Sequence, residues 1–333
     1  MWTSATEYTG GMIKVGVQAA LPDYLLRSLP AEAEVVRIPE KVTSPIDLDF
    51  WVLPFGSATA KAMAPHIQGY KVAQTITAGV DSILPWLPKG VTLCDGRGIH
   101  DISVSEWVVG VVLATYKRLP LYRDLQTVQV WKGQSQEAAF TDEEAVSNGL
   151  YRILGEDLYG RTVLIVGYGS IGLAIEERLR PFGVKFLRLA RTPKQNPEVR
   201  AIADLHELLP QADVIVVIVP LTDETRGFIG ERELSLMKEG ALLVNAARGP
   251  VVETNALVKA LTHHHLRAAL DVTDPEPLPA GHPLWSAPNL LLTPHVAGST
   301  PQFVERAFAF VGQQVKRMVD NQPLENIVTD AGY

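Results

Sequence analysis

One run of glycines near the middle of the chain most constrains what it can fold into. An apolar stretch at 163–166 leads directly into Gly167, Gly169 and Gly172, and an amphipathic stretch at 173–179 follows. This order predicts a buried strand, a tight turn and a helix whose first N–H groups face an anion. In that context the glycine spacing favours the pyrophosphate of a dinucleotide as the ligand. The alternative is a glycine-rich turn that only joins two packed elements.

Short apolar runs recur along the chain in two series, with helical stretches between them. The first series lies at 13–17, 34–38, 50–53, 71–76 and 91–94; the second lies at 163–166, 184–189, 213–219, 241–245, 266–271 and 290–293. Strands that alternate with helices are typical of parallel sheets in α/β proteins. The 333 residues are enough for about two domains. We therefore predict an α/β fold with two doubly wound, Rossmann-like domains.

Two long helical patterns flank the second series of strands. One runs from Val104 to about Thr127, and the other runs from Pro301 to Met318. The position of the second helix indicates that the chain returns to the first domain, so that two helices cross between the domains as a hinge. The polar segment 133–156 is interpreted as a surface excursion with a short helix at 142–148.

Composition narrows the classes of partner. The net charge of −7 argues against nucleic acid as a bulk partner. No apolar run approaches the roughly 18 residues of a membrane span, and the polar N-terminus does not resemble a signal peptide. The single cysteine, Cys94, excludes an intramolecular disulfide and is interpreted as a buried, inert thiol. We expect a cytoplasmic protein that binds neither nucleic acid nor membranes.

The end of the second strand of the cofactor domain bears on which dinucleotide binds. Sites that prefer NAD carry an acidic residue there, about 20 residues beyond the glycines, and no carboxylate lies at 189–194. Arg191, Thr192 and Lys194 instead offer two cations and a hydroxyl where a 2′-phosphate would bind. We therefore predict NADP(H) in preference to NAD(H). The alternative is that Arg191 is a solvated loop charge and that either cofactor is used.

Three ionisable residues follow three predicted strands of the second sheet, at the edge where open α/β sheets bind ligands. They are Arg248, Glu276 and His295. Taken singly, they could be a surface charge, a turn residue and a structural histidine. Together they suit hydride transfer to a carbonyl: a guanidinium can hold a carboxylate beside a ketone, an imidazolium can protonate the alkoxide, and a carboxylate can orient the imidazole.

With these residues the sequence resembles the D-isomer-specific 2-hydroxyacid dehydrogenases, a family that includes glyoxylate and hydroxypyruvate reductases and phosphoglycerate dehydrogenases. The likeness covers nearly the whole chain from about Met12. It is carried by GYGSIG at 167–172, VPLT at 219–222, NAARG at 245–249, ALDV at 269–272 with Glu276-Pro277, and LTPH at 292–295.

The resemblance implies a role for each candidate. Arg248 would bind the carboxylate and carbonyl of the substrate, His295 would be the acid/base, and Glu276 would be the partner of His295. The loop 77–81 is similar to the family's substrate loop, in which the amides of Ala78 and Gly79 would receive the carboxylate. The substrate would be a small 2-oxo acid, such as glyoxylate or hydroxypyruvate, that is reduced to the D-2-hydroxy acid.

The same resemblance implies the domain plan and the cofactor contacts. Residues 1–100 and 299–333 would form the substrate domain, residues 101–298 the inserted dinucleotide-binding domain, and two cofactor domains a homodimer. Asp271, with the loop around Ala246, would hold the nicotinamide carboxamide. The cofactor-binding positions predicted in all are Tyr168, Gly169, Ser170, Ile171, Arg191, Thr192, Lys194, Val219, Pro220, Thr225, Ala246, Arg248, Asp271, His295 and Gly298.

Some features depart from the family or stand outside it. Arg267 occupies a position where many relatives have glycine, and the excursion 133–156 is longer than usual. Arg97 is a candidate to bind a phosphate or a second carboxylate of the substrate, with an ordinary loop charge as the alternative. The run of histidines at 263–265 is interpreted as a solvated helix end, and no metal is expected.

Three other functions remain open at this point. A phosphoglycerate dehydrogenase, or another D-2-hydroxyacid dehydrogenase, would share every motif. A non-catalytic dinucleotide sensor, as in the corepressors that resemble this family, would keep the cofactor site alone, whereas the complete set of Arg248, Glu276 and His295 argues for turnover. A formate-dehydrogenase-like enzyme would lack the glutamate that Glu276 supplies.

Overall fold

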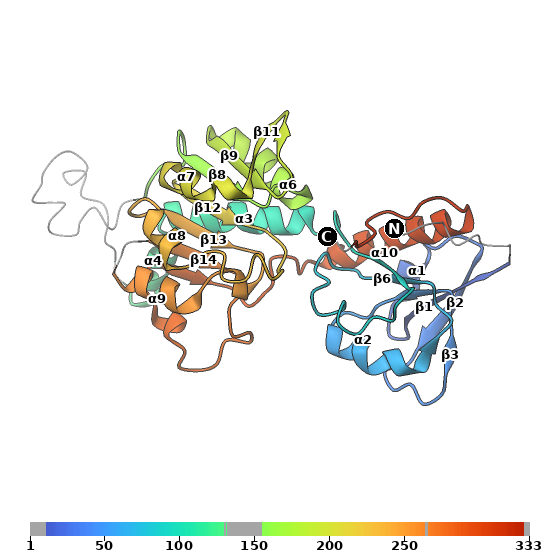
Figure 1. Ribbon diagram of the computed structural model, residues 1–333. Helices are drawn as coiled ribbons and strands as arrows, with labels where there is room; N and C mark the ends of the chain where they lie inside the picture. The colour runs from blue at the N-terminus through green and yellow to red at the C-terminus, as the bar shows by residue number, and fades with distance from the viewer. Residues whose placement is uncertain (1–10, 130, 132–154, 264–265, 330–333) are drawn as a thin grey trace, which may run out of the picture. The chain divides into compact units, whose positions relative to one another are not determined.

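The computed structural model describes residues 11–129, 131, 155–263 and 266–329. The predicted short helix at 142–148 lies outside the described residues. The chain divides into two compact units: unit 1 comprises 1–103 and 298–333, and unit 2 comprises 104–297. Figure 1 shows a sheet with helices on it in each unit. The predicted fold class, a parallel α/β architecture with one unit inserted in the other, is confirmed.

Unit 1 is built on a five-stranded parallel sheet in the order β2-β1-β4-β6-β7. Its strands are β1 (Ile13–Gln18), β2 (Ala33–Ile38), β4 (Phe50–Val52), β6 (Val72–Gln74) and β7 (Thr92–Cys94). They match the predicted first series. A separate two-stranded sheet of β3 (Ile46–Asp47) and β5 (Ile67–Gln68) was not predicted, because each strand has only two residues.

Helices cover both faces of the unit 1 sheet. The helices α1 (Asp23–Leu26) and α10 (Pro301–Val319) pack on the face formed by Ile13, Val15 and Val17 of β1, whereas α2 (Ser57–Met63) packs on the other face. The α10 residues on this core recur at helical spacing, at Phe303, Ala307, Phe308, Val311 and Val315. The C-terminal helix is therefore an integral part of the N-terminal unit.

Unit 2 is built on an eight-stranded sheet in the order β10-β11-β9-β8-β12-β13-β14-β15. The six predicted strands are present as β8 (Thr162–Val166), β9 (Lys185–Ala190), β12 (Val214–Val217), β13 (Leu242–Asn245), β14 (Arg267–Leu270) and β15 (Leu290–Leu292). The additional strands β10 (Lys194–Gln195) and β11 (Glu198–Ala201) were missed, because only Val199 in them is buried. The pairing of β10 with β11 is antiparallel, so this sheet is not wholly parallel as predicted.

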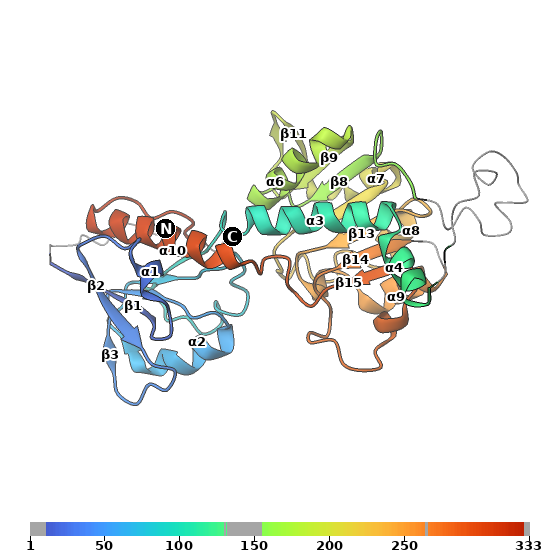
Figure 2. The same ribbon diagram turned by 180° about the vertical axis from the view of Figure 1, so that it is seen from behind.

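The central strands β8, β12 and β13 of unit 2 are buried on both faces, which is why they are almost wholly apolar. On one face, Val163 and Ile165 pack with α3 (Asp101–Tyr116) and α6 (Ser170–Leu179). On the other, Leu164 and Val166 pack with α7 (Leu205–Leu208), α8 (Glu231–Leu236) and α9 (Thr254–Thr262). Figure 2 shows α3 running across its face of this sheet.

The long helix predicted from Val104 to about Thr127 is in fact two helices. Helix α3 ends at Tyr116, Arg118 adopts a left-handed conformation with a φ of 55°, and α4 (Leu119–Thr127) follows. Pro120 is the physical reason, since it has no N–H and its ring would clash with the Tyr116 carbonyl in a continuous helix. That carbonyl instead accepts a hydrogen bond of 2.7 Å from the Glu156 N–H.

Candidate active site

The glycine loop lies where β8 is flanked by β9 on one side and β12 on the other, which is the point at which the strand order reverses. Gly167 has a φ of 107°, and a Cβ on it would lie 2.7 Å from the Ile218 carbonyl oxygen. A Cβ on Gly172 would lie 2.8 Å from the Gly167 oxygen, whereas no atom lies within 4 Å of one on Gly169. Gly167 and Gly172 therefore permit close packing, and Gly169 leaves room for a phosphate.

The loop is also held from the neighbouring strand. The N–H groups of Gly167 and Tyr168 both donate to the Leu189 carbonyl oxygen, each at 2.9 Å. Helix α6 begins at Ser170, three residues before the predicted start, so Ser170 and Ile171 lie in its first turn. This arrangement points the positive end of the α6 dipole at the loop, and the residues present fit a dinucleotide pyrophosphate.

The predicted adenosine end of the site follows β9. Arg191 and Thr192 are exposed, and Lys194 lies in β10. Sequence reasoning missed Glu224, which lies in the loop after β12. A hydrogen bond with Thr222, and to a smaller extent the charge of Arg191, lowers the pKa of Glu224. The charge of Glu224 therefore interacts with that of Arg191, the cation that was predicted to bind a 2′-phosphate.

Thr225 organises the loop that follows β12. Its Oγ1 donates to the Pro220 carbonyl oxygen at 2.6 Å and accepts from the Thr222 N–H at 2.8 Å. The loop that begins at Val219 and Pro220 is therefore closed by the threonine side chain. Thr225 holds the shape of the predicted cofactor loop through its hydroxyl.

Arg248 leaves the carboxyl end of β13 on a turn that Asn245 braces. The Asn245 side chain accepts from the Ala247 N–H at 3.0 Å and donates to the Arg248 carbonyl oxygen at 3.1 Å. A Cβ on Gly249 would lie 1.9 Å from the Thr273 carbonyl oxygen, so only glycine allows the loops after β13 and β14 to touch. The motif at 245–249 is explained by this bracing, a role that the sequence did not reveal.

Asp271 is a buried carboxylate that organises the loop after β15. It accepts hydrogen bonds from the Thr293 hydroxyl at 2.6 Å, the Val296 N–H at 2.8 Å and the Ala297 N–H at 2.9 Å. The His295 N–H donates to the Asp271 carbonyl oxygen at 2.7 Å, and His295 has a φ of 55°. Asp271 thereby fixes the backbone that presents His295.

His295 and Glu276 are brought together from two different strand ends. The distance from His295 Nδ1 to Glu276 Oε1 is 2.7 Å, and the two side chains are 45% and 42% exposed. An ionised carboxylate only accepts hydrogen bonds, so Nδ1 is the donor. The imidazole is thereby oriented with Nε2 available for proton exchange, which is the geometry of an acid/base histidine with a carboxylate partner.

The predicted substrate loop in unit 1 follows β6. The Thr75 hydroxyl donates to the Thr77 carbonyl oxygen at 2.6 Å, and the Thr77 hydroxyl donates to the Gly79 carbonyl oxygen at 3.4 Å. Among the described residues, neither the Ala78 nor the Gly79 N–H donates a hydrogen bond within the protein. The carbonyl oxygens of Thr77 and Gly79 accept hydrogen bonds, and the two neighbouring amides are available to a carboxylate.

Gly298, a predicted cofactor-binding position, also lies in unit 1, where a Cβ on it would meet the His100 ring.

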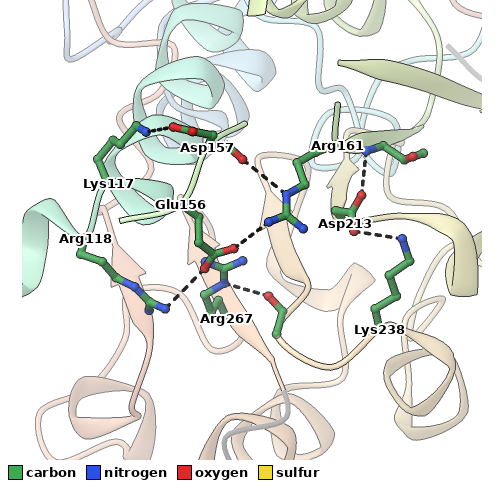
Figure 3. A network of polar contacts seen from close by, with 10 residues as sticks. Lys117, Arg118, Glu156, Asp157, Arg161, Asp213, Lys238 and Arg267 are labelled. Atoms are coloured by element: carbon green, nitrogen blue, oxygen red, sulfur yellow. Dashed lines mark hydrogen bonds and ion pairs between the residues drawn. The ribbon is translucent and has the colours of Figure 1, made fainter. Parts of the chain in front are cut away.

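A cavity of about 790 Å³ lies at the opposite, amino edge of the unit 2 sheet and contains none of the predicted site residues. Figure 3 shows its charged lining, in which Arg118, Arg161 and Arg267 surround Glu156. Arg267 also donates to the Gly240 carbonyl oxygen at 2.8 Å and lies 4.8 Å from the Tyr116 ring centroid. The arginine that stands where many relatives have glycine is therefore held by a carbonyl oxygen, a carboxylate and an aromatic ring.

The remaining predictions concern the cysteine, metal sites, the run of histidines and membrane spans. Burial raises the pKa of the Cys94 thiol to about 12, so it is not a thiolate at neutral pH. Within the described ranges, no cluster of histidine, cysteine and acidic side chains is arranged to hold a metal ion. Of the three consecutive histidines only His263 is described, and its ring contacts the Lys259 carbonyl oxygen. No described helix is long and apolar enough to span a membrane.

Comparisons with known proteins agree with this arrangement. Residues 109–297 match the model of the D-isomer specific 2-hydroxyacid dehydrogenase, NAD binding domain. The chain is 31% identical to D-3-phosphoglycerate dehydrogenase of Methanocaldococcus jannaschii over 85% of its own length and 52% of that protein, and thus spans about half of that relative. It is 36% identical to glyoxylate reductase of Thermofilum pendens over 73% of its own length and 69% of that protein.

A solved structure shows the same likeness. The NADPH-dependent glyoxylate/hydroxypyruvate reductase of Sinorhizobium meliloti, in complex with NADP and sulfate, superposes with a TM-score of 0.79 at 25% identity. The likeness covers 96% of this chain and 99% of that one. The similarity therefore extends over both units.

Proposed function

The chain belongs to the D-isomer specific 2-hydroxyacid dehydrogenase family, and we propose that it is an NAD(P)-dependent reductase of a small 2-oxo acid. The observation that carries this proposal is the His295–Glu276 pair, with 2.7 Å between Nδ1 and Oε1. A histidine paired with a carboxylate at the carboxyl ends of the strands suits a reaction that moves a proton, which a dinucleotide sensor does not need. The substrate class proposed is that of glyoxylate and hydroxypyruvate, and the product is the D-2-hydroxy acid.

The proposed chemistry divides among a few side chains. When bound, a reduced nicotinamide supplies the hydride. Arg248 binds the carboxylate and polarises the neighbouring carbonyl, because its planar guanidinium can donate to both groups. The amides of Ala78 and Gly79 receive the carboxylate, and Nε2 of His295 gives its proton to the developing alkoxide. Glu276 stabilises the imidazolium that donates this proton.

We propose that unit 1 is the substrate domain, unit 2 the dinucleotide-binding domain, and NADP(H) the preferred cofactor. The cation Arg191 and the absence of a carboxylate at 189–194 support this preference. The similar reductase of Sinorhizobium meliloti is NADPH-dependent and was solved with NADP. A homodimer formed by the cofactor domains and a cytoplasmic location complete the proposal, and the mass of the protein in solution tests the dimer.

The first experiment is a set of initial rates of NADPH and NADH oxidation with glyoxylate, hydroxypyruvate, pyruvate and phenylpyruvate. We expect faster consumption of NADPH than of NADH with at least one acid, and chiral chromatography should identify the D-hydroxy acid as product. Tight NADPH binding without turnover of any of these acids would favour a sensor instead. Equal rates with both cofactors would contradict the role of Arg191 and leave the reaction class intact.

A further inference from the structure

The segment that follows β7 lies directly beside the substrate loop of unit 1. The Thr75 N–H donates to the Cys94 carbonyl oxygen, and the Gly96 N–H donates to the Thr77 carbonyl oxygen, each at 2.9 Å. A Cβ on Gly96 would lie 2.8 Å from the Ile76 carbonyl carbon, so the two segments are in backbone contact. Arg97 and Ala78 are therefore the next residues on either side of the Gly96–Thr77 hydrogen bond.

The side chain of Arg97 is held in place from one side. Its Nε and its backbone N–H both donate to Oδ1 of Asp95, at 2.9 and 3.0 Å, and the Asp95 side chain is 0% exposed. The Arg97 carbonyl oxygen accepts a hydrogen bond of 2.9 Å from the Asn326 side chain. The buried carboxylate of Asp95 thus anchors the guanidinium at Nε, and Asn326 anchors the backbone of Arg97.

The outer edge of the same guanidinium is unused by the protein. Among the described residues, the two Nη nitrogens of Arg97 have no hydrogen-bond partner, and the side chain is 39% exposed. The two Nη groups form the planar fork that suits a carboxylate or phosphate. Because Asp95 already fixes the guanidinium, binding an anion there costs little ordering of the side chain.

Resting on the proposed function, we propose that Arg97 is a specificity-determining residue that binds a second anionic group, a carboxylate or a phosphate, on the 2-oxo acid. The first carboxylate occupies the amides of the adjacent loop, and the far end of the acid reaches the Arg97 fork. The preferred substrates are then dianionic 2-oxo acids, and acids with an uncharged side chain are poorer substrates of the same site.

Two matched pairs of substrates test this role. Hydroxypyruvate and its 3-phosphate differ only in the phosphate, and 2-oxobutyrate and oxaloacetate differ in a methyl group replaced by a carboxylate. Values of kcat/KM should be measured for the full chain and for the Arg97→Met and Arg97→Lys variants. Arg37→Met is the control, because Arg37 is a comparably exposed, ion-paired arginine on β2, the strand at the other end of the sheet from β7.

We expect the unchanged protein to favour the dianionic acid of at least one pair by roughly 10- to 100-fold, the effect of one charged hydrogen-bonded contact. Arg97→Met should abolish that preference and change kcat/KM for the uncharged acid less than about threefold, while Arg97→Lys keeps part of it. The pair that responds distinguishes a phosphate from a carboxylate.

Other outcomes overturn the inference in distinguishable ways. Equal losses on both acids of each pair in Arg97→Met would indicate a merely structural arginine. No preference in the unchanged protein, with normal turnover of uncharged acids, would refute the inference and leave the proposed function standing. If neither NADPH nor NADH is consumed with any of the acids, the proposed function fails and the inference fails with it.

Discussion

The chemistry of single residues in this protein depends on neighbours that hold them in uncommon positions. His295 has a positive φ, an uncommon conformation for a residue other than glycine. It is retained because Asp271 accepts hydrogen bonds from the N–H of His295 and from the next N–H, that of Val296, and because Glu276 holds its ring. Asn245 has the same function for the turn that presents Arg248. The backbone of the proposed acid/base residue is therefore held by the buried carboxyl group of Asp271.

We expect His295→Gln to lower kcat for 2-oxo acid reduction by about 10²- to 10⁴-fold, the usual loss when a general acid is removed. NADPH affinity, measured by quenching of its fluorescence, should be nearly unchanged. His206→Gln is the control, because His206 is similarly exposed and also pairs with a glutamate at 2.7 Å. A loss of kcat less than tenfold in His295→Gln would refute the acid/base role.

At the scale of elements, the two edges of the unit 2 sheet have different tasks. The carboxyl ends of β8, β12, β13, β14 and β15 carry the predicted site, whereas the amino ends carry the network around Glu156. β14 links the two edges, since it begins at Arg267 and leads directly into Asp271. The break between α3 and α4 frees the Tyr116 carbonyl to hold the Glu156 backbone. We therefore expect substitutions at the amino edge to change the stability of this unit without changing the proposed chemistry.

We expect Arg267→Met to reduce the free energy of unfolding by roughly 1.5–3 kcal/mol, because it removes charged hydrogen bonds to Glu156 and Gly240 from a buried position. Urea denaturation measures the loss, and kcat/KM should stay within about twofold of the starting value. The control is Lys117→Met, which breaks an exposed ion pair with Asp157 and should cause no measurable change. Equal stability of the two variants would show that the network contributes little.

At the scale of the whole molecule, the two ends of the chain form one core. Helix α10 near the C-terminus packs on β1 near the N-terminus, and the Ser28 hydroxyl donates to the Phe308 carbonyl oxygen at 2.8 Å. The two chain segments that join unit 1 to unit 2 are also tied together within unit 1. Ser103 and Thr300 lie 3.2 Å apart, and Arg306 donates to Ser103 at 2.7 Å.

Two glycines inside helices test whether α10 packs closely on the N-terminal residues. A Cβ on Gly312 of α10 would lie 2.1 Å from the Ser28 carbonyl oxygen, whereas no atom lies within 4 Å of one on Gly110 of α3. Gly312→Ala should therefore destabilise the protein by about 1–3 kcal/mol through overpacking. Gly110→Ala should stabilise it by about 0.4–1 kcal/mol. Thermal denaturation measures both, and a stabilised Gly312→Ala variant would show that α10 does not pack closely on the N-terminal residues.

Local pattern in the sequence was sufficient for what depends on local physics. All eleven predicted strands are present, and the central strands of unit 2 were recognisable because a parallel strand that is buried on both faces is almost wholly apolar. The glycine loop was recognisable because its glycine spacing is set by backbone sterics and by the room that a phosphate needs. The prediction of a single helix over 104–127 was wrong. It relied on the apolar spacing and gave too little weight to Pro120, which marks a helix boundary in the sequence. The strands β10 and β11 were missed because they bury almost nothing.

The sequence by itself determined the fold class, the dinucleotide loop and the identity of the residues offered for chemistry. Only the tertiary structure decided which of them meet. Glu276 and His295 are 19 residues apart and form a pair because β14 and β15 are neighbours. Asn245 as a brace, Arg267 as a partnered cation and Asp95 as the anchor of Arg97 also depend on contacts between elements. Such contacts follow from how strands and loops are placed in space, which no local periodicity encodes.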